Sequence, residues 1–252
     1  MTQPIIRFQG VSKAFGIQTV LRDFSLDVEP GAFVSIIGRS GCGKTTVLKL
    51  VNGLLSPDTG RVLIQGQDVA RIDPVALRRR IGYAIQNVGL FPHMTVEKNI
   101  AYVPAISHLE GWKGPARRER VSALLRQVGL DPALAGRYPR ALSGGQRQRV
   151  GIARALAAGP ELLLMDEPFG AVDEITRGQL QDELLRIHRE SGITVLFVTH
   201  DIAEALKLGT RTLVMDAGLI QQYDAPSRLL AHPATSFVER LVRRSRVFQT
   251  RA

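Results

Sequence analysis

The chain has 252 residues, 44% hydrophobic and 22% charged, and its 33 lysines and arginines exceed the 23 aspartates and glutamates to give a formal net charge of +10. This composition is that of an ordinary soluble globular protein, and the single cysteine, Cys42, excludes an intramolecular disulfide and the secreted disulfide-framework class. The N-terminus has no apolar stretch long enough for a signal peptide, and no apolar run approaches the ~18 residues that span a bilayer, so we expect a cytosolic chain without a membrane helix.

The N-terminal third shows short apolar or alternating runs that are typical of strands, separated by turn signals such as Pro30-Gly31. The strands that we predict there are Ile5 to Phe8, Leu21 to Val28, Phe33 to Ile37, Arg61 to Gln65 and Ile81 to Ile85, the last two as a pair. From Lys44 to Leu50 the pattern becomes helical.

Residues from about Val88 to Ala158 differ, because they show helical periodicity and almost no strand signal. The elements predicted after this block are strands at Leu162 to Met165, Thr194 to Val198 and Arg211 to Met215, with a helix from Arg177 to Glu190. Buried strands that alternate with amphipathic helices indicate an α/β sheet with helices on its faces. We therefore interpret the middle block as a helical insertion into an α/β core.

The positive charge consists of 27 arginines and only 6 lysines, scattered along the chain. A nucleic-acid binder usually gathers its cations in a stripe with aromatic residues between them, and aromatics make up only 6% here. Solvated faces together with a phosphate-handling site are therefore the favoured interpretation. A nucleic-acid or anionic-lipid surface is the alternative.

One glycine-rich segment fits the phosphate-loop pattern G-x-x-x-x-G-K-[ST] and lies between the apolar strand and the helix. Its residues are Gly38, Arg39, Ser40, Gly41, Cys42, Gly43, Lys44 and Thr45. The glycines let successive N–H groups turn toward phosphate oxygens, and the start of the helix offers its positive end. Lys44 can reach the β- and γ-phosphates and Thr45 can ligate Mg²⁺. The segment therefore predicts nucleotide binding.

Two carboxylates end the apolar run Leu162 to Met165, at Asp166 and Glu167. An aspartate at a strand end beside a phosphate loop is suited to hold Mg²⁺, directly or through water. The adjacent glutamate could orient and polarise the attacking water. We therefore predict a catalytic role for this strand end, with Asp166 as a metal ligand and Glu167 as the residue that orients the attacking water.

A third motif, Leu142-Ser143-Gly144-Gly145-Gln146, lies between these two and opens the helical stretch Arg147 to Ala158. Its serine hydroxyl and glycine N–H groups form another anion site at a helix N-terminus. In this order the three motifs resemble the nucleotide-binding subunits of ABC transporters, and the resemblance runs from Phe8 to about Leu230. It implies that Ser143, Gly144, Gly145 and Gln146 of one subunit close over the ATP held by another, in a head-to-tail dimer.

The resemblance also implies the fold, an ABC-type ATPase with a P-loop NTPase core, an N-terminal antiparallel β subdomain and an inserted helical subdomain. The expected single domain comprises the α/β core with its β subdomain at 1–87 and 159–223, and the helical signature subdomain at 88–158. Residues 224–252 are expected to form a C-terminal helical tail, without the CBS domains that several members carry.

Further site residues follow from the resemblance, one position at a time. Phe15 matches the aromatic that stacks on adenine, and Thr46 extends the phosphate loop. Gln86 resembles the glutamine that touches Mg²⁺ or the water and senses the membrane partner. Asp173 resembles the residue that signals across the dimer, and His200 the histidine that contacts the γ-phosphate. Together with Lys44 and Glu167, Gln86 and His200 make up the expected catalytic set.

The resemblance implies ATP and Mg²⁺ as cofactors. It implies a second ATPase subunit, in a homodimer, and transmembrane permease subunits as partners. An extracytoplasmic substrate-binding protein would act indirectly, and the location would be the cytoplasmic face of the inner membrane. The stretches Ile81 to Thr95, Pro168 to Arg177 and Leu180 to Leu184 look most like importers of quaternary-amine osmoprotectants such as glycine betaine, choline, carnitine and proline betaine. No nucleic acid is expected.

Three alternatives stay open from the sequence. Other uptake ATPases, for polyamines, sulfonates or iron, share parts of the same stretches. A soluble ABC-type ATPase acting on ribosomes or DNA is disfavoured, because the chain has one copy of each motif, no heptads and no zinc spacing. A simple nucleotide kinase would not explain the motif at Ser143 to Gln146.

Two smaller features complete the predictions. Cys42 lies beside a helix N-terminus, which should favour the thiolate, so we expect thiol reagents to inactivate the protein and bound ATP to protect it. The segment from Glu239 to Ala252 holds five arginines and one glutamate, and is either a helix with a frayed end or a contact with an anionic membrane.

Overall fold

A computed structural model describes residues 3–85, 89–170 and 172–249, with side chains placed up to residue 243 in the last helix. The chain divides into two compact units. Unit 1 consists of residues 1–77 and 194–252, and unit 2 of residues 78–193. The helix α2 (Pro74–Arg80) contains the boundary between them.

Unit 1 contains an antiparallel sheet with the strand order β2-β1-β4-β5. Its strands are β1 (Ile6–Phe15), β2 (Gln18–Val28), β4 (Thr59–Ile64) and β5 (Gln67–Asp68). Phe8 and Phe24 pack edge to face between β1 and β2, with ring centroids 5.1 Å apart. β1 is longer than predicted, because register shifts between Phe8 and Val11 break the alternation by which a strand is recognised. β5 is too short to give a sequence signal.

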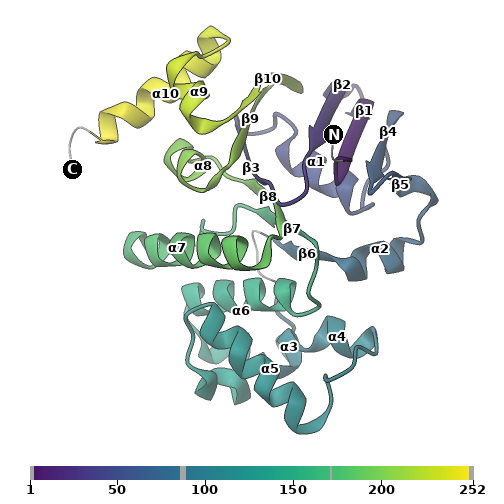
Figure 1. Ribbon diagram of the computed structural model, residues 1–252, viewed down its shortest axis with the longest axis vertical. Coiled ribbons are helices and arrows are strands. Elements are labelled where there is room, and N and C mark those ends of the chain that lie inside the picture. Colours follow the sequence, from purple (N-terminus) through teal and green to yellow (C-terminus); the bar gives the residue numbers. More distant parts are fainter. Residues whose placement is uncertain (1–2, 86–88, 171, 250–252) are drawn as a thin grey trace. The chain divides into compact units, whose positions relative to one another are not determined.

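Four further strands of unit 1 follow the order β10-β9-β3-β8 (Figure 1). They are β3 (Phe33–Gly38), β8 (Thr194–Val198), β9 (Arg211–Asp216) and β10 (Leu219–Asp224). β3 is parallel to β8 and β9 and its first five residues are buried, as expected for a strand covered on both faces. β10 pairs antiparallel with β9 at the edge, and its partly exposed polar residues explain why it was not predicted.

The helices of unit 1 include α1 (Lys44–Val51), α8 (Ile202–Leu208), α9 (Pro226–Ala231) and α10 (Ser236–Gln249). Val238 and Val242 of α10 are buried in one apolar cluster with Ile37 of β3 and Val214 of β9. Burial of a valine side chain stabilises a fold by roughly 1.5–3 kcal/mol. The first half of α10 is therefore an integral part of unit 1, and the helix predicted for the tail is present.

In unit 2 the strands β6 (Ile81–Ala84) and β7 (Leu162–Asp166) pair in parallel. The predicted pairing of Arg61 to Gln65 with Ile81 to Ile85 is wrong, because β4 pairs with β1 and β5 whereas β6 pairs with β7. Both segments are strands, but a parallel partner is brought by a long crossover that local sequence does not reveal.

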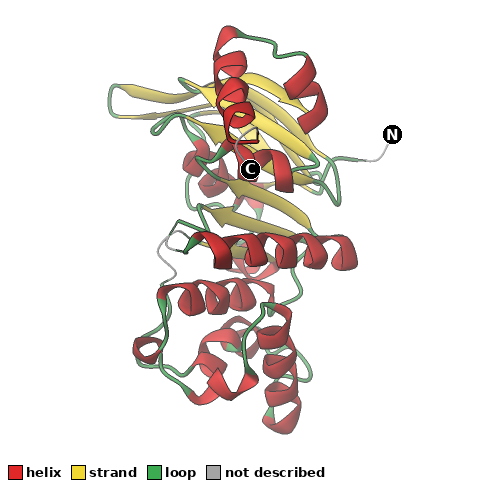
Figure 2. Ribbon diagram, turned by 90° about the vertical axis from the view of Figure 1, so that its left-hand side faces the viewer, coloured by secondary structure: helices red, strands yellow, loops and turns green. Residues whose placement is uncertain are grey.

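The crossover between β6 and β7 is mostly helical, as Figure 2 shows. Its α-helices are α3 (Val96–Ile100), α4 (Tyr102–Ile106), α5 (Gly114–Gln127) and α6 (Gly144–Leu156), and α7 (Glu174–Ser191) follows β7. Two short 3₁₀ helices, Pro132–Gly136 and Pro139–Ala141, precede α6. The helical middle block was predicted from periodicity, and the structure confirms its helical character.

Polar anchors fix the start of this helical block. The side-chain amide of Asn99, fully buried, receives a hydrogen bond from the N–H of Phe91 and donates to its carbonyl, at 2.8 and 3.1 Å. Arg154 of α6 donates to the carbonyl of Gly89 at 2.9 Å and lies over the Phe91 ring. Trp112 is 6% exposed, with the Arg120 guanidinium 5.8 Å from its ring centroid.

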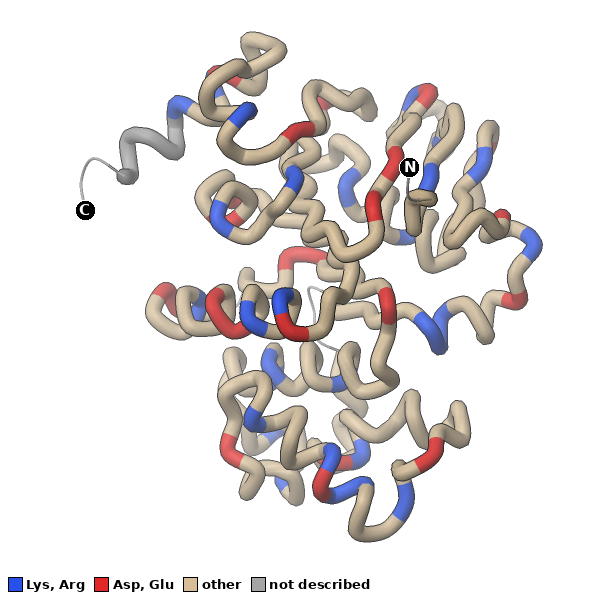
Figure 3. Tube along the Cα trace, in the orientation of Figure 1, with Lys and Arg blue, Asp and Glu red and all other residues tan. Residues whose placement is uncertain are grey.

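Charged residues of both signs are distributed over both units, as Figure 3 shows. Among the described residues, no helix combines the length and apolarity that a membrane span requires. The basic excess is therefore dispersed, which fits the interpretation that most of these arginines lie on solvated faces.

Candidate functional site

The loop from Gly38 to Gly43 joins β3 to α1 in unit 1. A Cβ atom at Gly38 would lie 2.1 Å from the Met215 carbonyl oxygen and 2.7 Å from Cys42 Sγ. Real side chains do not tolerate such distances, so only glycine lets β3 enter the loop beside β9. The glycine of the sequence pattern is thus required because Met215 and Cys42 leave no space for a side chain at the start of the loop.

Two glycines of the loop adopt left-handed backbone conformations. Gly41 has φ +77° with open space where a Cβ would lie, and Gly43 has φ +105°. At Gly43 a Cβ would lie 2.8 Å from Leu21 Cδ2 and 2.9 Å from the Val20 carbonyl oxygen. Gly43 is also the N-cap of α1, which has no side-chain cap. The first turn of α1 is therefore not closed by a capping side chain, as an anion site at a helix N-terminus requires.

Lys44 is held across the entrance of this loop. Its Nζ donates to the carbonyl oxygens of Gly38 and Arg39 at 2.8 and 2.9 Å, and the residue is 7% exposed. Neutral carbonyl oxygens do not balance the positive charge of a buried ammonium group. Lys44 is thus a positioned cation beside the loop, while Thr45 and the buried Thr46 follow it on α1.

The expectation that Cys42 favours the thiolate is wrong. The side chain is 4% exposed, and burial raises the pKa of the Cys42 thiol above its ordinary value. The charge of Lys44 and the N–H of Lys44 act in the opposite direction but are the smaller effects. Desolvation by β3 and β9 neighbours therefore outweighs the helix N-terminus, and the thiol is a packed, neutral group.

His200 lies two residues after the end of β8, and the residues on both sides of it, Thr199 and Asp201, are held by hydrogen bonds. The Thr199 hydroxyl donates to a carboxylate oxygen of the buried Glu204 at 2.6 Å. Asp201 caps α8 by accepting from the N–H of Ala203 at 2.8 Å. His200 itself is exposed and lines a cavity of about 470 Å³ together with Gly38 and Ser40 of the loop. The structure therefore brings His200 to the phosphate loop within unit 1.

The same cavity has a wall that the sequence analysis did not identify. It is formed by residues of α10, among them Phe237, Arg240 and Arg243. A helix was expected for the tail, but nothing in the local sequence indicated that this helix reaches the loop. α10 lies beside the loop because it packs in the same apolar cluster as β3 and β9.

Phe15 lies at the end of β1 and is 49% exposed, so it is not a core aromatic. The Lys13 ammonium lies 5.8 Å from its ring centroid. The neighbouring strand β2 carries Val20, which abuts Gly43. An exposed ring on the sheet whose adjacent strand touches the loop is available for stacking.

Unit 2 holds the two carboxylates at the end of β7. Asp166 is 9% exposed and closes a strand that is buried throughout. Burial, with a smaller contribution from the charge of Asp166, raises the pKa of Tyr83 on the paired strand β6 to about 12. Glu167 has φ +45°, an uncommon conformation for a residue with a side chain. Strain of this kind concentrates at functional sites, and sequence reasoning had no means of detecting it.

The third motif, Leu142 to Gln146, hereafter the signature segment, forms a complete capping box at the start of α6. The Ser143 hydroxyl accepts from the N–H of Gln146 at 3.2 Å, and the Gln146 side chain accepts from the N–H of Ser143 at 2.9 Å. The first four N–H groups of a helix have no acceptor within it. The box uses that of Gln146, so those of Gly144 and Gly145 have no acceptor within the helix.

Asp173 lies next to this segment in unit 2. It caps α7 by accepting from the N–H of Thr176 at 3.0 Å, and this bond is the main cause of the lowered pKa of its carboxyl. A Cβ at Gly145 would lie 3.7 Å from Thr176 Cγ2. The N-termini of α6 and α7 are thus neighbours, so the signature and Asp173 form one surface.

The predicted site residues therefore form two groups. In unit 1 they are Phe15, Gly38, Arg39, Ser40, Gly41, Cys42, Gly43, Lys44, Thr45, Thr46 and His200. In unit 2 they are Ser143, Gly144, Gly145, Gln146, Asp166, Glu167 and Asp173. Gln86 lies outside the described residues.

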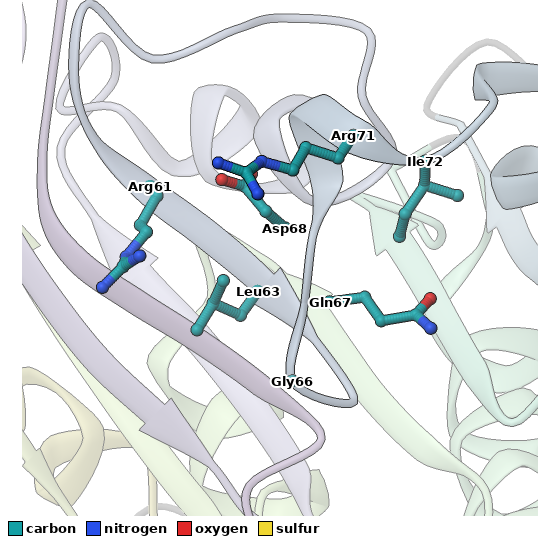
Figure 4. Close-up of a pocket in the computed structure, with 7 residues that line it drawn as sticks. All are labelled: Arg61, Leu63, Gly66, Gln67, Asp68, Arg71 and Ile72. Atoms are coloured by element: carbon teal, nitrogen blue, oxygen red, sulfur yellow. The ribbon is translucent and has the colours of Figure 1, made fainter.

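A second cavity, of about 550 Å³, lies on the antiparallel sheet around β4 and β5. Figure 4 shows Arg61, Arg71 and Asp68 on one side of it and Leu63 between them and Gly66. No predicted site residue lines this cavity, so the phosphate loop remains the candidate site.

Comparison with known proteins gives a consistent result. The family model described as "ABC transporter" matches residues 21–170. The chain is 46% identical over 248 residues to the glycine betaine/carnitine/choline transport ATP-binding protein OpuCA of Bacillus subtilis, covering 98% of the chain and 64% of that protein. It is 48% identical over 241 residues to the glycine betaine uptake system ATP-binding protein YehX of Escherichia coli, covering 96% and 77%.

Among solved structures, the chain is similar to the ATP-binding cassette MJ0796, a dimer bound to ADP and Pi in a post-hydrolysis state. The TM-score is 0.81 at 33% identity, and the match covers 88% of the chain and 98% of the cassette. The predicted α/β fold with a phosphate loop is thereby confirmed. The chain spans less than two thirds of the length of OpuCA but more than two thirds of YehX. From these matches, and from the three motifs now placed in the structure, the chain belongs to the ABC transporter family.

Proposed function

We propose that the chain is the ATP-hydrolysing subunit of an ABC importer for a quaternary-amine osmoprotectant such as glycine betaine, choline, carnitine or proline betaine. The observation that carries the ATPase part is the loop from Gly38 to Lys44, in which glycine is required for space at Gly38 and Gly43. The transport proteins named above for glycine betaine, carnitine and choline support the cargo.

The loop and His200 account for phosphate binding in this proposal. The uncapped N-terminus of α1 supplies N–H groups and its positive end, and Lys44 supplies a full charge beside them. His200 faces the cavity beside Gly38 and Ser40, where the terminal phosphate would lie. Phe15 would stack on the adenine. Catalysis then rests largely on positioning and on stabilisation of the developing charge.

Mg²⁺ fits the donors that the chain offers. Thr45 provides a hydroxyl and Asp166 a carboxylate, both hard oxygen ligands of the kind that Mg²⁺ prefers. Mg²⁺ is usually held by one or two protein groups together with phosphates and water, so a larger cluster is not needed. We assign Thr45 and Asp166 to the metal, with Gln86 as the third member. When bound, the ion supplies charge neutralisation between the phosphates.

Glu167 is the proposed base for hydrolysis. Its carboxylate would accept a proton from the attacking water, and its strained backbone would fix its direction at the end of β7. Asp173 and the N–H groups of Gly144 and Gly145 would complete the site of a second copy, because one nucleotide needs only one phosphate loop. ATP would thus join two subunits head to tail, and hydrolysis would release them.

The remaining proposals concern the partners. The helical segment 88–158, with Gln86 at its entry, would transmit closure to permease subunits at the cytoplasmic face of the inner membrane. A substrate-binding protein outside the membrane would deliver the cargo. An uptake assay in vesicles containing the permease tests the cargo: glycine betaine or choline should accumulate with ATP, and accumulation of a different solute class would reassign the importer.

The decisive test of the ATPase part is dimer formation by the variant Glu167→Gln. Light scattering should show a monomer that becomes a dimer on addition of Mg-ATP, because ATP binds and is not hydrolysed. Adding Ser143→Arg should prevent the dimer while ATP binding by the monomer persists. A chain that binds ATP and stays monomeric in both backgrounds, even with the permease present, would contradict the shared-site mechanism.

A further inference from the structure

The cavity beside the phosphate loop has a second wall made by the C-terminal helix α10. The loop side contributes Gly38, Arg39 and Ser40, and α10 contributes Arg240 and Arg243 among others. All of these residues belong to unit 1. The cavity is thus formed by two segments that are about two hundred residues apart in sequence.

α10 is held firmly at this position. Val238 is fully buried and Val242 is 3% exposed, and both pack in the cluster that includes Ile37, the residue before Gly38. On the cavity side, the Arg39 guanidinium lies 5.1 Å from the centroid of the Phe237 ring. A residue of the loop therefore contacts α10 directly, so the basic side chains of α10 are presented to the loop by a packed helix.

The charges around the cavity are predominantly positive. Arg243 is paired with Glu239 on α10 at 2.7 Å, and Arg39 makes a longer approach of 3.9 Å to Asp216. For Arg240, which is exposed, no ion pair is recorded among the residues that the structure describes. With His200 also on the wall, the cavity combines guanidinium groups with a histidine and the polar start of the phosphate loop. Planar guanidinium donors of this kind suit phosphate oxygens.

We propose that this cavity binds a phosphate-class oxyanion and that Arg240 of α10 is a principal cation for it. The proposal rests on the proposed nucleotide site, which it extends by a wall from the C-terminal helix. The oxyanion can be the terminal phosphate of a nucleotide held by Lys44, or free inorganic phosphate. In either case α10 links the state of the loop to the C-terminal end of the chain.

Isothermal titration of the full chain at constant ionic strength tests the proposal with three probes, ATP, ADP and inorganic phosphate. Glu167→Gln serves as the common background so that ATP is not hydrolysed. Arg240→Ala should lower the affinity for the ligand that occupies the cavity roughly fivefold, and Arg240→Lys should restore part of that affinity. Arg228→Ala on α9 is the matched control, because Arg228 is exposed, lies on the neighbouring helix and does not line the cavity.

The outcomes separate the two sources of the oxyanion. Loss of ATP affinity with ADP unchanged assigns the terminal phosphate, whereas loss of phosphate affinity with both nucleotides unchanged assigns free phosphate. Equal affinities in Arg240→Ala and Arg228→Ala for all three probes would overturn the proposal. If Glu167→Gln without a second substitution binds neither nucleotide, the proposed function is contradicted. The phosphate titration then tests by itself whether the cavity binds an oxyanion.

Discussion

The N-termini of α1 and α6 are both proposed to meet phosphate, yet they are built differently. α1 begins at Gly43, which has no side chain, and its loop is shaped by close contacts of glycines with β2 and β9. α6 begins at Ser143, whose hydroxyl joins with Gln146 in a reciprocal capping box. The geometry of the α1 N-terminus depends on contacts with other strands, whereas the α6 N-terminus is stabilised by hydrogen bonds between its own residues. The difference teaches that one anion site is set by tertiary packing and the other by four consecutive residues.

The strongest test of this contrast is Gly43→Ala. The left-handed φ and the contacts at 2.8 and 2.9 Å predict a loss of about 2–5 kcal/mol in the free energy of unfolding. Urea denaturation followed by circular dichroism measures it. Gly41→Ala is the control, because its φ is also positive but space is open, so only about 1–2 kcal/mol should be lost. Equal losses in both would show that packing does not set the α1 end.

Cys42 tests how closely the α1 end is packed. Because burial raises the pKa of its thiol, alkylation near neutral pH should be at least about tenfold slower than for an exposed thiol, and faster as the pH rises. Mass spectrometry during iodoacetamide treatment measures the rate, with glutathione as the reference. A thiol that reacts as fast as glutathione at pH 7 would mean that the loop opens readily.

Ser143→Ala tests the self-stabilised end. Loss of the capping hydroxyl should lower the free energy of unfolding by about 1 kcal/mol, and Ser143→Thr should retain most of it. ATP binding by the monomer should not change in either variant, since the loop belongs to unit 1. Denaturation and nucleotide titration check both parts. A large loss of monomer ATP affinity would show that the two ends are not independent.

Asp173 gives the smallest expected effect, through pH. Its pKa is lowered mainly by the hydrogen bond from the Thr176 N–H, so its stabilising contribution is present above the ordinary carboxyl pKa of about 4. That contribution is lost as the pH falls through the lowered value. Asp173→Asn keeps a capping oxygen but does not titrate. The difference in unfolding midpoint between the two proteins should therefore change slightly below pH 4, and a constant difference would contradict the assignment.

Features that depend on consecutive residues were predictable from the sequence. The phosphate loop, the strand before it and the signature at the start of a helix each follow from spacing and residue type, and the structure places them as expected. Lys44 is named by its motif alone. The helical insertion into an α/β core followed from periodicity, and the resemblance to ABC transporters added the N-terminal antiparallel β subdomain.

Features that depend on distant segments were not predictable. The burial of Cys42 arises from β3 and β9 together, and it reversed the expected direction of the thiol pKa. The partners of β4 and β6 were misassigned because β4 pairs with β1, about fifty residues earlier, and β6 pairs in parallel with β7, about eighty residues later, and neither distant pairing leaves a local signal. The cavity wall of α10 joins the loop across most of the chain, and the positive φ of Glu167 is a property of the folded backbone.

The position of Trp112 has a practical consequence for following this molecule in solution. It is the only tryptophan of the chain, and it is buried in unit 2 under the Arg120 guanidinium. Fluorescence excited selectively at tryptophan therefore reports on unit 2 alone, and the phosphate loop of unit 1 contributes no tryptophan signal. Emission and circular dichroism recorded along one urea titration would coincide if both halves unfold cooperatively, and would separate if each half unfolds by itself. Trp112 emission can therefore show whether nucleotide binding in unit 1 stabilises unit 2 against unfolding.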